Sequence, residues 1–325
     1  MGQLILTVTR ACNLRCSYCP TAKDGWPSLT KEDVHKAIDL FVYRFGGGSI
    51  KIFGGEPLLV PDIVDEAISY ASTHPLIDWV YLSTNGLPLH AALLSRLAKH
   101  KKLILTLSMD GKEEDHDRMR RALPNVQRSY THILSLLDEL QRMPRLVVTQ
   151  TIAPATAKRA FSNFEHLYQL GFRKFNFLPG YYIPWKPAQL AYLKGNFKKI
   201  ASFIAREWQK NSFVYVRNLF VQAPTPFFNT GLIVDSDRSI HANNLGLSGN
   251  LDHLRQKTVV GDLDHPPSKE QLQRKTKEVS AILTEALPER ILHSTNAVDA
   301  LLTGFCKTLW PLFLRYKQRK REWLA

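Results

Sequence analysis

The sequence is poor in cysteine and has no long apolar run. Four cysteines in 325 residues are too few for a disulfide scaffold. The longest apolar stretches, Leu4–Val8 and Leu103–Leu107, are far shorter than the roughly 20 residues of a membrane-spanning helix. The first residues, MGQLILTV, lack the basic and long apolar regions of a secretory signal. We therefore expect a soluble, cytoplasmic protein with no membrane partner.

Acidic residues are also in short supply. The chain has 43 Lys and Arg against 29 Asp and Glu, a net charge of +14, which favours acidic partners through long-range attraction. The last eleven residues, RYKQRKREWLA, carry five of the positive charges and one Glu. Such a block is either a solvated helix face or a contact for an acidic partner. No RNA-binding signature or interleaved aromatic pattern is present, so nucleic acid is not an expected partner.

The chain does contain a regular alternation of strand and helix patterns up to about residue 210. The length suits two domains, or one α/β barrel with an appendage. Apolar runs of this kind are typical of buried parallel strands joined by right-handed crossovers. The expected strands are 4–9, 49–53, 79–84, 103–109, 146–152 and 174–177, and the expected helices between them are 31–43, 61–72, 90–99, 129–141 and 160–170.

The remainder of the chain has a different pattern. We expect a long helix over 187–209, strands near 213–221 and 231–235, a polar loop over 236–267, and helices from 268 onward. In sheets of parallel strands, functional residues collect at the carboxyl ends of the strands. The motifs described next all follow an expected strand.

Three of the four cysteines lie within eight residues, in TRACNLRCSYCP. Cys12, Cys16 and Cys19 have the spacing Cys-x3-Cys-x2-Cys, directly after the first expected strand. Three thiolates can hold a four-iron cluster and leave one iron open. A zinc site usually has a fourth Cys or His nearby, and none follows within ten residues. The alternative is three buried, inert cysteines.

This arrangement, with Tyr18 before the third cysteine, resembles the radical S-adenosylmethionine (SAM) superfamily. The resemblance implies a partial (β/α)6 TIM-like barrel over residues 1–210 and a small α+β extension over 211–325. It also implies one [4Fe–4S] cluster that binds SAM at its open iron. In the family, reduction of the cluster cleaves SAM to methionine and a 5′-deoxyadenosyl radical.

The second strand is followed by Gly54, Gly55, Glu56 and Pro57, which look like the family's GGEP motif. Glycines let a backbone approach a ligand closely, and a carboxylate can meet an ammonium group. The resemblance implies that this motif holds the amino group of SAM. On its own, a Gly-Gly pair before a helix is commonly only a turn.

Similar polar groups follow the next two strands. Ser83 and Asn85 end the third, and Ser108 and Asp110 end the fourth; the alternative for each is turn chemistry. The run SMDGKEEDHDRMR resembles a stretch of the peptide-modifying branch of the superfamily. The resemblance places Ser108 against the nucleoside or methionine part of SAM. It makes a site wall of Asp110, His116, Asp117 and Arg120, although His116 and Arg120 also suit a solvated surface.

The sixth strand leads into candidate adenine and substrate contacts. The resemblance places Leu178 against the adenine. Tyr181 and Tyr182 are candidate catalytic or substrate-lining residues, with Trp185 beside them, although aromatic strand ends commonly serve packing. Gln150, on the fifth strand, is a further candidate whose side chain could point into the barrel.

The C-terminal region departs from the peptide-modifying branch, whose SPASM and twitch domains bind auxiliary clusters through extra cysteines. Residues 228–244 look like a degenerate version of their shared hairpin, with Asn243 at a cluster cysteine and Asn244 at the acidic residue after it. Only Cys306 remains elsewhere. It is either a buried apolar residue or a thiol that returns hydrogen to a substrate radical. Without a second cluster, redox-neutral outcomes such as epimerisation, rearrangement or carbon–carbon coupling are favoured.

The resemblance also predicts the partners. We expect a peptide or ribosomal natural-product precursor as substrate, with a small-molecule metabolite as the alternative, and an external one-electron reductant of the flavodoxin or ferredoxin type. The chain starts just before its first strand, so a peptide substrate is expected to be captured by the C-terminal region or by a separate leader-binding protein. A different class, a basic iron–sulfur binding or sensing protein without catalysis, is the rival hypothesis.

Overall fold

The computed structural model describes residues 2–19, 21–220, 232–243 and 254–324. The chain forms two compact units that interleave along the sequence. Unit 1 comprises Met1–Leu107, Arg120–Leu146 and Thr225–Ala286, and unit 2 comprises Ser108–Met119, Val147–Pro224 and Leu287–Ala325. The domain boundary expected near residue 210 stays a prediction.

Unit 1 is built on a largely parallel sheet. Its strand order is β12-β11-β10-β1-β3-β4-β5. The strands from β10 to β5 run parallel, whereas β10, β11 and β12 pair antiparallel at the edge. The bounds are β1 Gly2–Thr9, β3 Gly48–Gly54, β4 Ile77–Thr84, β5 Leu103–Ser108, β10 Leu232–Val234, β11 Ser239–His241 and β12 Val259–Asp262. A separate antiparallel pair joins β2 (Leu14–Cys16) to β6 (Arg120–Ala122).

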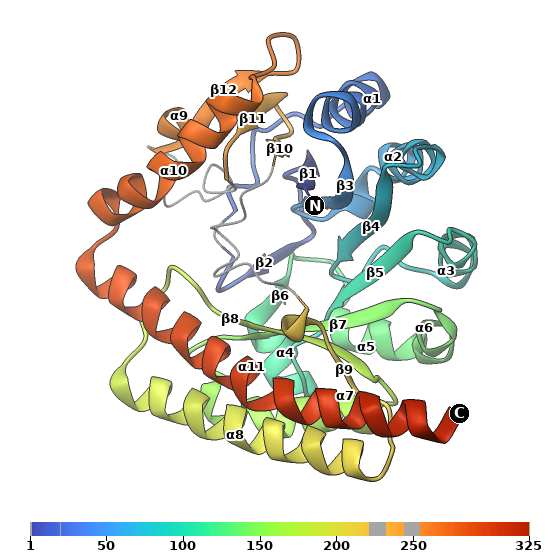
Figure 1. Cartoon of the computed structure of the whole chain (residues 1–325). Helices are drawn as coiled ribbons and strands as arrows, with labels where there is room; N and C mark the ends of the chain where they lie inside the picture. The colour runs from blue at the N-terminus through green and yellow to red at the C-terminus, as the bar shows by residue number, and fades with distance from the viewer. Residues whose placement is uncertain (1, 20, 221–231, 244–253, 325) are drawn as a thin grey trace. The chain divides into compact units, whose positions relative to one another are not determined.

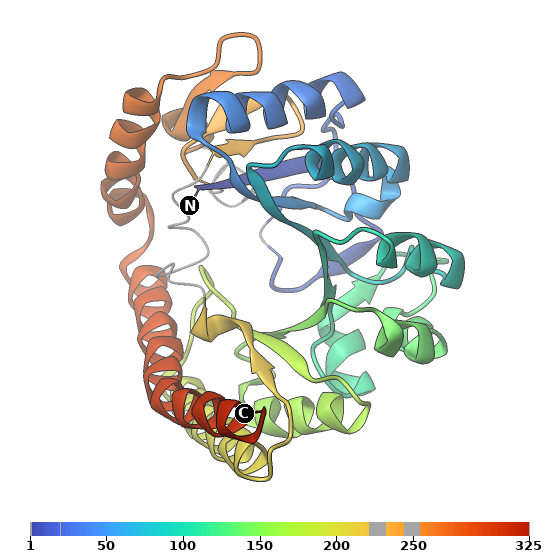
Figure 2. The ribbon, with the colours of Figure 1, turned by 45° about the vertical axis from the view of Figure 1, so that its right-hand side comes forward.

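Helices cover the sheet of unit 1 because its strands are apolar on both faces. In β1, for example, Leu4, Ile5, Leu6 and Val8 are all buried. Figures 1 and 2 show three of the helices, α1, α2 and α3, on one side of β1, β3 and β4. The helices are α1 Lys31–Asp39 (continued by a π-helical turn, Leu40–Arg44), α2 Pro61–Thr73, α3 Ala91–Ala98, α5 Ser129–Ser135, α6 Leu137–Arg142, α9 Arg255–Thr258 and α10 Lys269–Ala286.

Unit 2 contains three parallel strands in the order β7-β8-β9. These are β7 Leu146–Ile152, β8 Lys174–Pro179 and β9 Tyr215–Val216. Two long helices, α8 (Pro187–Gln209) and α11 (Glu289–Leu324), pack along each other in this unit (Figure 2). The shorter elements are α4 Glu113–Met119, α7 Ala160–Gln169 and the 3-10 turns Ala157–Arg159 and Arg217–Leu219.

Most of the expected elements are confirmed. All six expected strands are present, and the long helix over 187–209 has the predicted bounds. Thr30 caps α1 and forms the expected capping box with Asp33, and Pro61 opens α2. The alternation of strands and helices confirms the α/β class.

Three expectations differ from the structure. The helix expected over 129–141 breaks at Leu136, which is not fully helical and separates α5 from α6. Among the described residues 213–220 of the segment expected as a strand over 213–221, only Tyr215–Val216 forms one. The polar segment 236–267 was expected to be a loop, but it contains β11, α9 and β12. These elements have only three or four residues each, too few to show a periodic pattern.

Helix α11 bears on the membrane expectation. Helix α11 contains a stretch, Glu289–Lys320, that is long and apolar enough to cross a membrane by length and composition, and 17% of its apolar window is buried. The sequence search for unbroken apolar runs missed it because polar residues interrupt the stretch. One side of α11 packs on α8, where Phe305 stacks on Phe197 with ring centroids 4.9 Å apart.

Candidate active site

The cysteine loop of unit 1 lies between β1 and the start of α1. Cys12 follows β1 closely, and Cys16 ends β2. Cys19 closes a turn by donating its backbone N–H to the Cys16 carbonyl at 3.1 Å. Because Cys16 is paired with Arg120 of β6, the loop is anchored by a strand pair. None of the three cysteines is in a disulfide, and all three are half-buried.

The two outer cysteines have different electrostatic surroundings. Burial raises the pKa of Cys12, although its Sγ accepts a hydrogen bond from the Leu14 N–H at 3.4 Å. Burial also disfavours the Cys19 thiolate. The positive charge of Lys23, whose Nζ lies 3.2 Å from Cys19 Sγ, and hydrogen bonds from Thr21 together outweigh this effect of burial. The pKa of Cys19 is therefore held below its ordinary value. A lowered thiol pKa favours metal ligation, since the thiolate is the ligand.

The donor set fits an iron–sulfur cluster. Among the described residues, no group of three or more His, Cys, Asp or Glu side chains is already arranged to hold a metal ion. The three thiols therefore share a loop rather than a preformed cage. Cys12 and Cys19 nonetheless lie near enough to interact electrostatically. Three soft thiolates on one short loop, with no fourth ligand beside them among the residues that the structure describes, match a cluster with one open iron.

The glycine pair after β3 packs directly on the chain that precedes Cys12. A Cβ atom on Gly55 would lie 2.2 Å from the carbonyl oxygens of Arg10 and Ala11. Gly54 has a φ of +150°, and a Cβ there would lie 2.0 Å from the Thr9 carbonyl oxygen. Backbone hydrogen bonds from Gly55 to Thr9 and from Glu56 to Ala11 close this contact. Only glycine permits the approach, so the motif fixes the start of the cysteine loop.

The Glu56 carboxylate lies inside the molecule. Its side chain is fully buried and accepts hydrogen bonds from Leu58 N–H at 3.1 Å, Thr84 Oγ1 at 2.8 Å and Asn85 N–H at 2.6 Å. Burial raises its pKa to about 7, against the opposing effect of these donors. The side chain thus joins the ends of β3 and β4, while Pro57 begins a 3-10 turn, Pro57–Leu59. Binding of SAM by this motif stays a prediction.

Asn85 connects the end of β4 to the cysteine loop. Its Nδ2 donates to Asn13 Oδ1 at 2.7 Å and lies 3.9 Å from Cys12 Sγ. Its own Oδ1 accepts from the Leu87 N–H at 3.0 Å. Ser83 precedes it on β4, in register with Thr106. Asn85 is therefore the predicted residue with the most direct tie to a cluster cysteine.

Tyr18 and Arg120 form the remaining part of the site in unit 1. The Arg120 guanidinium lies 5.5 Å from the centroid of the Tyr18 ring, a cation–π contact. Arg120 is buried and pairs with Cys16 across β2 and β6. Its charge offsets part of the rise that burial causes in the pKa of Glu56. The structure thus brings together the cysteine loop, the glycine motif, Asn85, Tyr18 and Arg120.

The other residues expected after the fourth strand lie in unit 2. Asp110 is buried, and its Oδ1 accepts from the Thr151 N–H at 3.0 Å. The Asp110 N–H donates to Nδ1 of the fully buried His116 at 3.2 Å. His116 is therefore not a solvated surface residue. Ser108 ends β5, and Asp117 lies on α4. Asp110 and His116 support the strand end rather than face solvent.

The loop after β8 is held by α11. Leu178 lies on β8 in register with Thr151. The Tyr181 hydroxyl donates to Asp299 Oδ1 at 3.3 Å, and both burial and Asp299 raise the pKa of Tyr181. Tyr182 has a φ of +59°, and its N–H donates to Thr295 Oγ1 at 3.1 Å. These contacts fix the two tyrosines on the strand end.

Other candidates near this loop have structural partners. Trp185 is buried, and its ring N–H donates to the Gly180 carbonyl at 2.8 Å, which favours packing. Gln150 Nε2 donates to the Ala160 carbonyl of α7 at 3.1 Å, so this end of its side chain meets a helix. Burial raises the pKa of Cys306 to about 11, and its thiol lies 3.6 Å from the Asn218 carbonyl oxygen. The thiol is therefore protonated at neutral pH, as both hypotheses for Cys306 require.

Sequence reasoning missed a buried ion pair beside the cysteine loop. Arg10, two residues before Cys12, is fully buried and pairs through both Nε and Nη2 with Asp235 at the end of β10. The Arg10 guanidinium lies 3.5 Å from the Trp26 ring centroid, and that of Arg255 lies 4.9 Å from it. The pair spans 225 positions, and no local pattern signals it.

The expected hairpin in the C-terminal region exists as β10 and β11. Asn243 follows β11 and is buried, so an amide stands where the resemblance implies a cluster cysteine. Residues 228–231 and Asn244 lie outside the described residues. His241 on β11 donates to or accepts from Thr258 Oγ1 at 2.9 Å, and burial lowers its pKa to about 4. No auxiliary metal site is evident in residues 232–243 or 254–324.

Comparison with known proteins decides the family. The profile of the radical SAM superfamily matches residues 6–182, more than half of the chain. The chain belongs to the radical SAM superfamily. It is a radical SAM enzyme, and its cofactors are a [4Fe–4S] cluster and SAM. The SPASM or twitch assignment and the peptide-modifying branch are not established by these comparisons.

Curated relatives match a limited part of this radical SAM enzyme. A GTP 3′,8-cyclase from Chlorobaculum tepidum is 33% identical over 149 residues, covering 44% of this chain and 42% of that protein. The mouse molybdenum cofactor biosynthesis protein 1 is 37% identical over 115 residues, covering 33% of this chain and 17% of that protein. The chain thus spans less than half the length of these relatives.

Solved structures agree with the fold over a longer range. The structure of anSMEcpe with bound AdoMet has a TM-score of 0.75 and 15% identity, covering 98% of this chain and 99% of that one. The structure of Streptococcus suis SuiB bound to the precursor peptide SuiA has a TM-score of 0.57 and 14% identity, covering 76% and 60%. At these identities the likeness concerns the fold. It supports the partial TIM-like barrel with a C-terminal helical extension.

Proposed function

We propose that this radical SAM enzyme abstracts a hydrogen atom from its substrate and returns one, so that the substrate is neither oxidised nor reduced. When bound, the reduced cluster supplies the electron that cleaves SAM to methionine and the 5′-deoxyadenosyl radical. Cys12, Cys16 and Cys19 would hold the cluster. Gly54 and Gly55 would present the backbone that orients SAM.

The contact between the glycine motif and the start of the cysteine loop carries this proposal. The two elements that would meet the cofactors are locked together by the close approach of Gly55 to Arg10 and Ala11. The carboxylate of Glu56 and the amide of Asn85 add hydrogen bonds between the strand ends. Such rigid support is what a reactive intermediate needs, since small displacements of a reacting group cost large factors in rate.

The redox-neutral outcome rests on the C-terminal hairpin. Asn243 is a buried amide, which is not an iron–sulfur ligand, and Cys306 is the only cysteine outside the loop. A second cluster held by cysteine thiolates would therefore lack ligands. An external reductant of the flavodoxin or ferredoxin type and a cytoplasmic location belong to the same proposal.

Two substrate classes are supported by different observations. The SMDG…HD stretch favours a peptide or ribosomal precursor, in which case a separate leader-binding protein belongs to the proposal. The curated relatives favour a small-molecule metabolite, since they are named GTP 3′,8-cyclases and molybdenum cofactor biosynthesis proteins. The tyrosine loop after β8 is the candidate substrate contact in either case.

The test supplies the reconstituted enzyme with SAM, dithionite and either GTP or short peptides encoded beside its gene, in deuterated water. Formation of 5′-deoxyadenosine should rise with one class of substrate only. The product should have the substrate's mass, or one additional mass unit where deuterium is returned. A product lacking two hydrogen atoms, formed without any added electron acceptor, would contradict the redox-neutral outcome.

A further inference from the structure

Exposed apolar side chains gather on one part of unit 2. Four of the nine large apolar side chains that lie exposed among the described residues are Phe213, Phe220, Trp310 and Leu314, each between 42% and 46% exposed. We call these four residues the aromatic face. Phe220 and Trp310 are in edge contact, with ring centroids 6.2 Å apart. The face therefore joins α11 to the segments that flank β9.

The aromatic face is not the side of α11 that stabilises the fold. The inward side carries Phe305 and Leu309, both buried, and Tyr316, which stacks on Trp208 of α8 at 5.8 Å. That side of α11 is therefore covered by α8. Trp310 and Leu314 lie between the buried positions and face away from α8. They are among the many residues left unburied in the apolar window of this helix, of which 17% is buried.

Positive charge surrounds the same stretch of helix. Residues 300–321 contain six Lys and Arg and no acidic residue. The described part of the chain shows no ion pair to any of Lys307, Arg315, Lys317, Arg319 or Lys320, and all five are exposed. Lys320 lies 5.7 Å from the Phe213 ring. Apolar and basic side chains are therefore interleaved on one surface.

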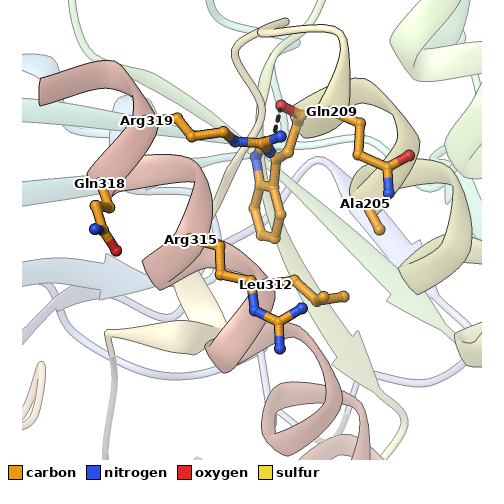
Figure 3. Close-up of a pocket in the computed structure, with 7 residues that line it drawn as sticks. Ala205, Gln209, Leu312, Arg315, Gln318 and Arg319 are labelled. Atoms are coloured by element: carbon orange, nitrogen blue, oxygen red, sulfur yellow. Dashed lines mark hydrogen bonds between the residues drawn. The ribbon is translucent and has the colours of Figure 1, made fainter. Parts of the chain in front are cut away.

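A separate groove of about 400 Å³ lies between the ends of α8 and α11. Figure 3 shows that Arg315, Gln318 and Arg319 line it from α11, and Gln209 lines it from α8. Arg319 Nη2 donates to the Trp208 carbonyl at 3.3 Å, which holds its guanidinium at the groove. The described residues that line the groove supply two guanidinium groups and two amides and no carboxylate, an environment that suits an anionic group such as phosphate.

We propose that the C-terminal half of α11 docks this enzyme on an anionic lipid membrane. The aromatic face enters the boundary between headgroups and acyl chains, and the exposed lysines beside it meet the negative surface. A helix with Trp and Leu on one side and Lys and Arg around them binds in this interfacial manner. It does not span the bilayer, because its other side is packed on α8. An acidic protein would satisfy the charge but not the exposed tryptophan and leucine.

The test is vesicle co-sedimentation of the full-length, cluster-loaded enzyme. We compare phosphatidylcholine vesicles with vesicles that also contain about 30 mol% phosphatidylglycerol. Binding to the anionic vesicles should be at least about tenfold stronger and should weaken as salt is added. The double variant Trp310→Ser/Leu314→Ser should lose about tenfold or more of that binding. The variant Arg315→Gln/Arg319→Gln should reduce the salt dependence.

A matched control removes exposed apolar area elsewhere. Tyr43 and Leu76 of unit 1 are exposed, and Tyr43→Ser/Leu76→Ser should bind vesicles like the unchanged protein. Iron content and the formation of 5′-deoxyadenosine in solution should stay unchanged in all variants, which shows that they fold. The proposal fails if anionic vesicles are not bound at low salt, or if Trp310→Ser/Leu314→Ser binds them normally. It also fails if duplex DNA of equal phosphate content displaces the enzyme completely, since the surface is then a general polyanion site.

Discussion

Single residues set the geometry of the cysteine loop. Cys16 ends β2 and is paired with Arg120, whereas Cys306 lies in unit 2 on α11. Replacement of Cys16 by Ala removes one of three ligands, so the loop should hold less than half of the iron of the unchanged protein. The matched variant Cys306→Ala should keep the full iron content. Iron and sulfide analysis after anaerobic reconstitution measures both, and full iron binding by Cys16→Ala would contradict the cluster assignment.

Gly55 is the second residue at which a small change has a large expected effect. Its Cβ would lie 2.2 Å from the carbonyl oxygens of Arg10 and Ala11, two backbone atoms that cannot move without shifting Cys12. Gly55→Ala should therefore lower 5′-deoxyadenosine formation at least about tenfold. Gly195 in α8 has open space around it, so Gly195→Ala should keep activity and gain up to about 1 kcal/mol in stability. Equal activity of the two variants would show that the close approach is not required.

His241 should make the stability of unit 1 depend on pH. Burial lowers its pKa to about 4, with Asp235 and Asp237 opposing and Arg255 and Arg10 adding to the shift. The pKa of His241 is near 6.5 in the unfolded state and about 4 in the folded state. Between pH 6.5 and pH 4, the unfolded state therefore binds more protons than the folded state. Stability should therefore fall as the pH drops through this window, by about 3 kcal/mol in total.

Denaturant unfolding at a series of pH values measures this effect. His241→Gln cannot take up the proton and should lose the His241 contribution between pH 6.5 and 4, while other acid-sensitive groups remain. An identical pH dependence in the variant and the unchanged protein would exclude His241 as the source.

At the scale of elements, the hairpin β10–β11 stabilises the cysteine loop through Arg10 and Asp235. Both side chains are almost completely buried. Asp235→Asn removes the carboxylate that neutralises Arg10, and breaking a buried pair in this way typically costs about 3–5 kcal/mol. The variant should unfold at lower denaturant concentration and retain less iron. The double variant Arg10→Gln/Asp235→Asn should recover part of the loss, because it leaves no uncompensated charge.

A double-mutant cycle on unfolding free energy separates these outcomes. The electron paramagnetic resonance signal of the reduced cluster reports on the geometry of the cysteine loop. A structural defect far from the loop would leave this signal unchanged. If the signal and iron content of Asp235→Asn match those of the unchanged protein, the hairpin does not position the loop.

At the scale of the whole molecule, the sequence predicts what is local and repetitive. The six parallel strands are apolar runs with turn residues at both ends, and the cysteine spacing is a local motif, so both were predictable. The pair of Arg10 with Asp235 was not, because its partners lie 225 positions apart. The elements β11, α9 and β12 were missed because each is too short for a periodic pattern. The apolar stretch of α11 was missed because its apolar residues are interrupted by polar ones at helical spacing.

Glu56 shows, within the site, that a sequence motif predicts a residue but not its contacts. The motif predicts a carboxylate near the cofactors, but only the fold shows that this carboxylate is enclosed by donors from Leu58, Thr84 and Asn85. Local patterns identified the residues of the site. Their partners depend on which strand ends the sheet brings together.

The measurement that tests the central claim most directly is the formation of 5′-deoxyadenosine by the reconstituted enzyme with SAM and dithionite. With about four iron atoms bound per chain, the enzyme should form 5′-deoxyadenosine and methionine in equal amounts, and Cys16→Ala should form neither. A preparation that holds the full complement of iron and binds SAM, yet yields no 5′-deoxyadenosine, would contradict the account.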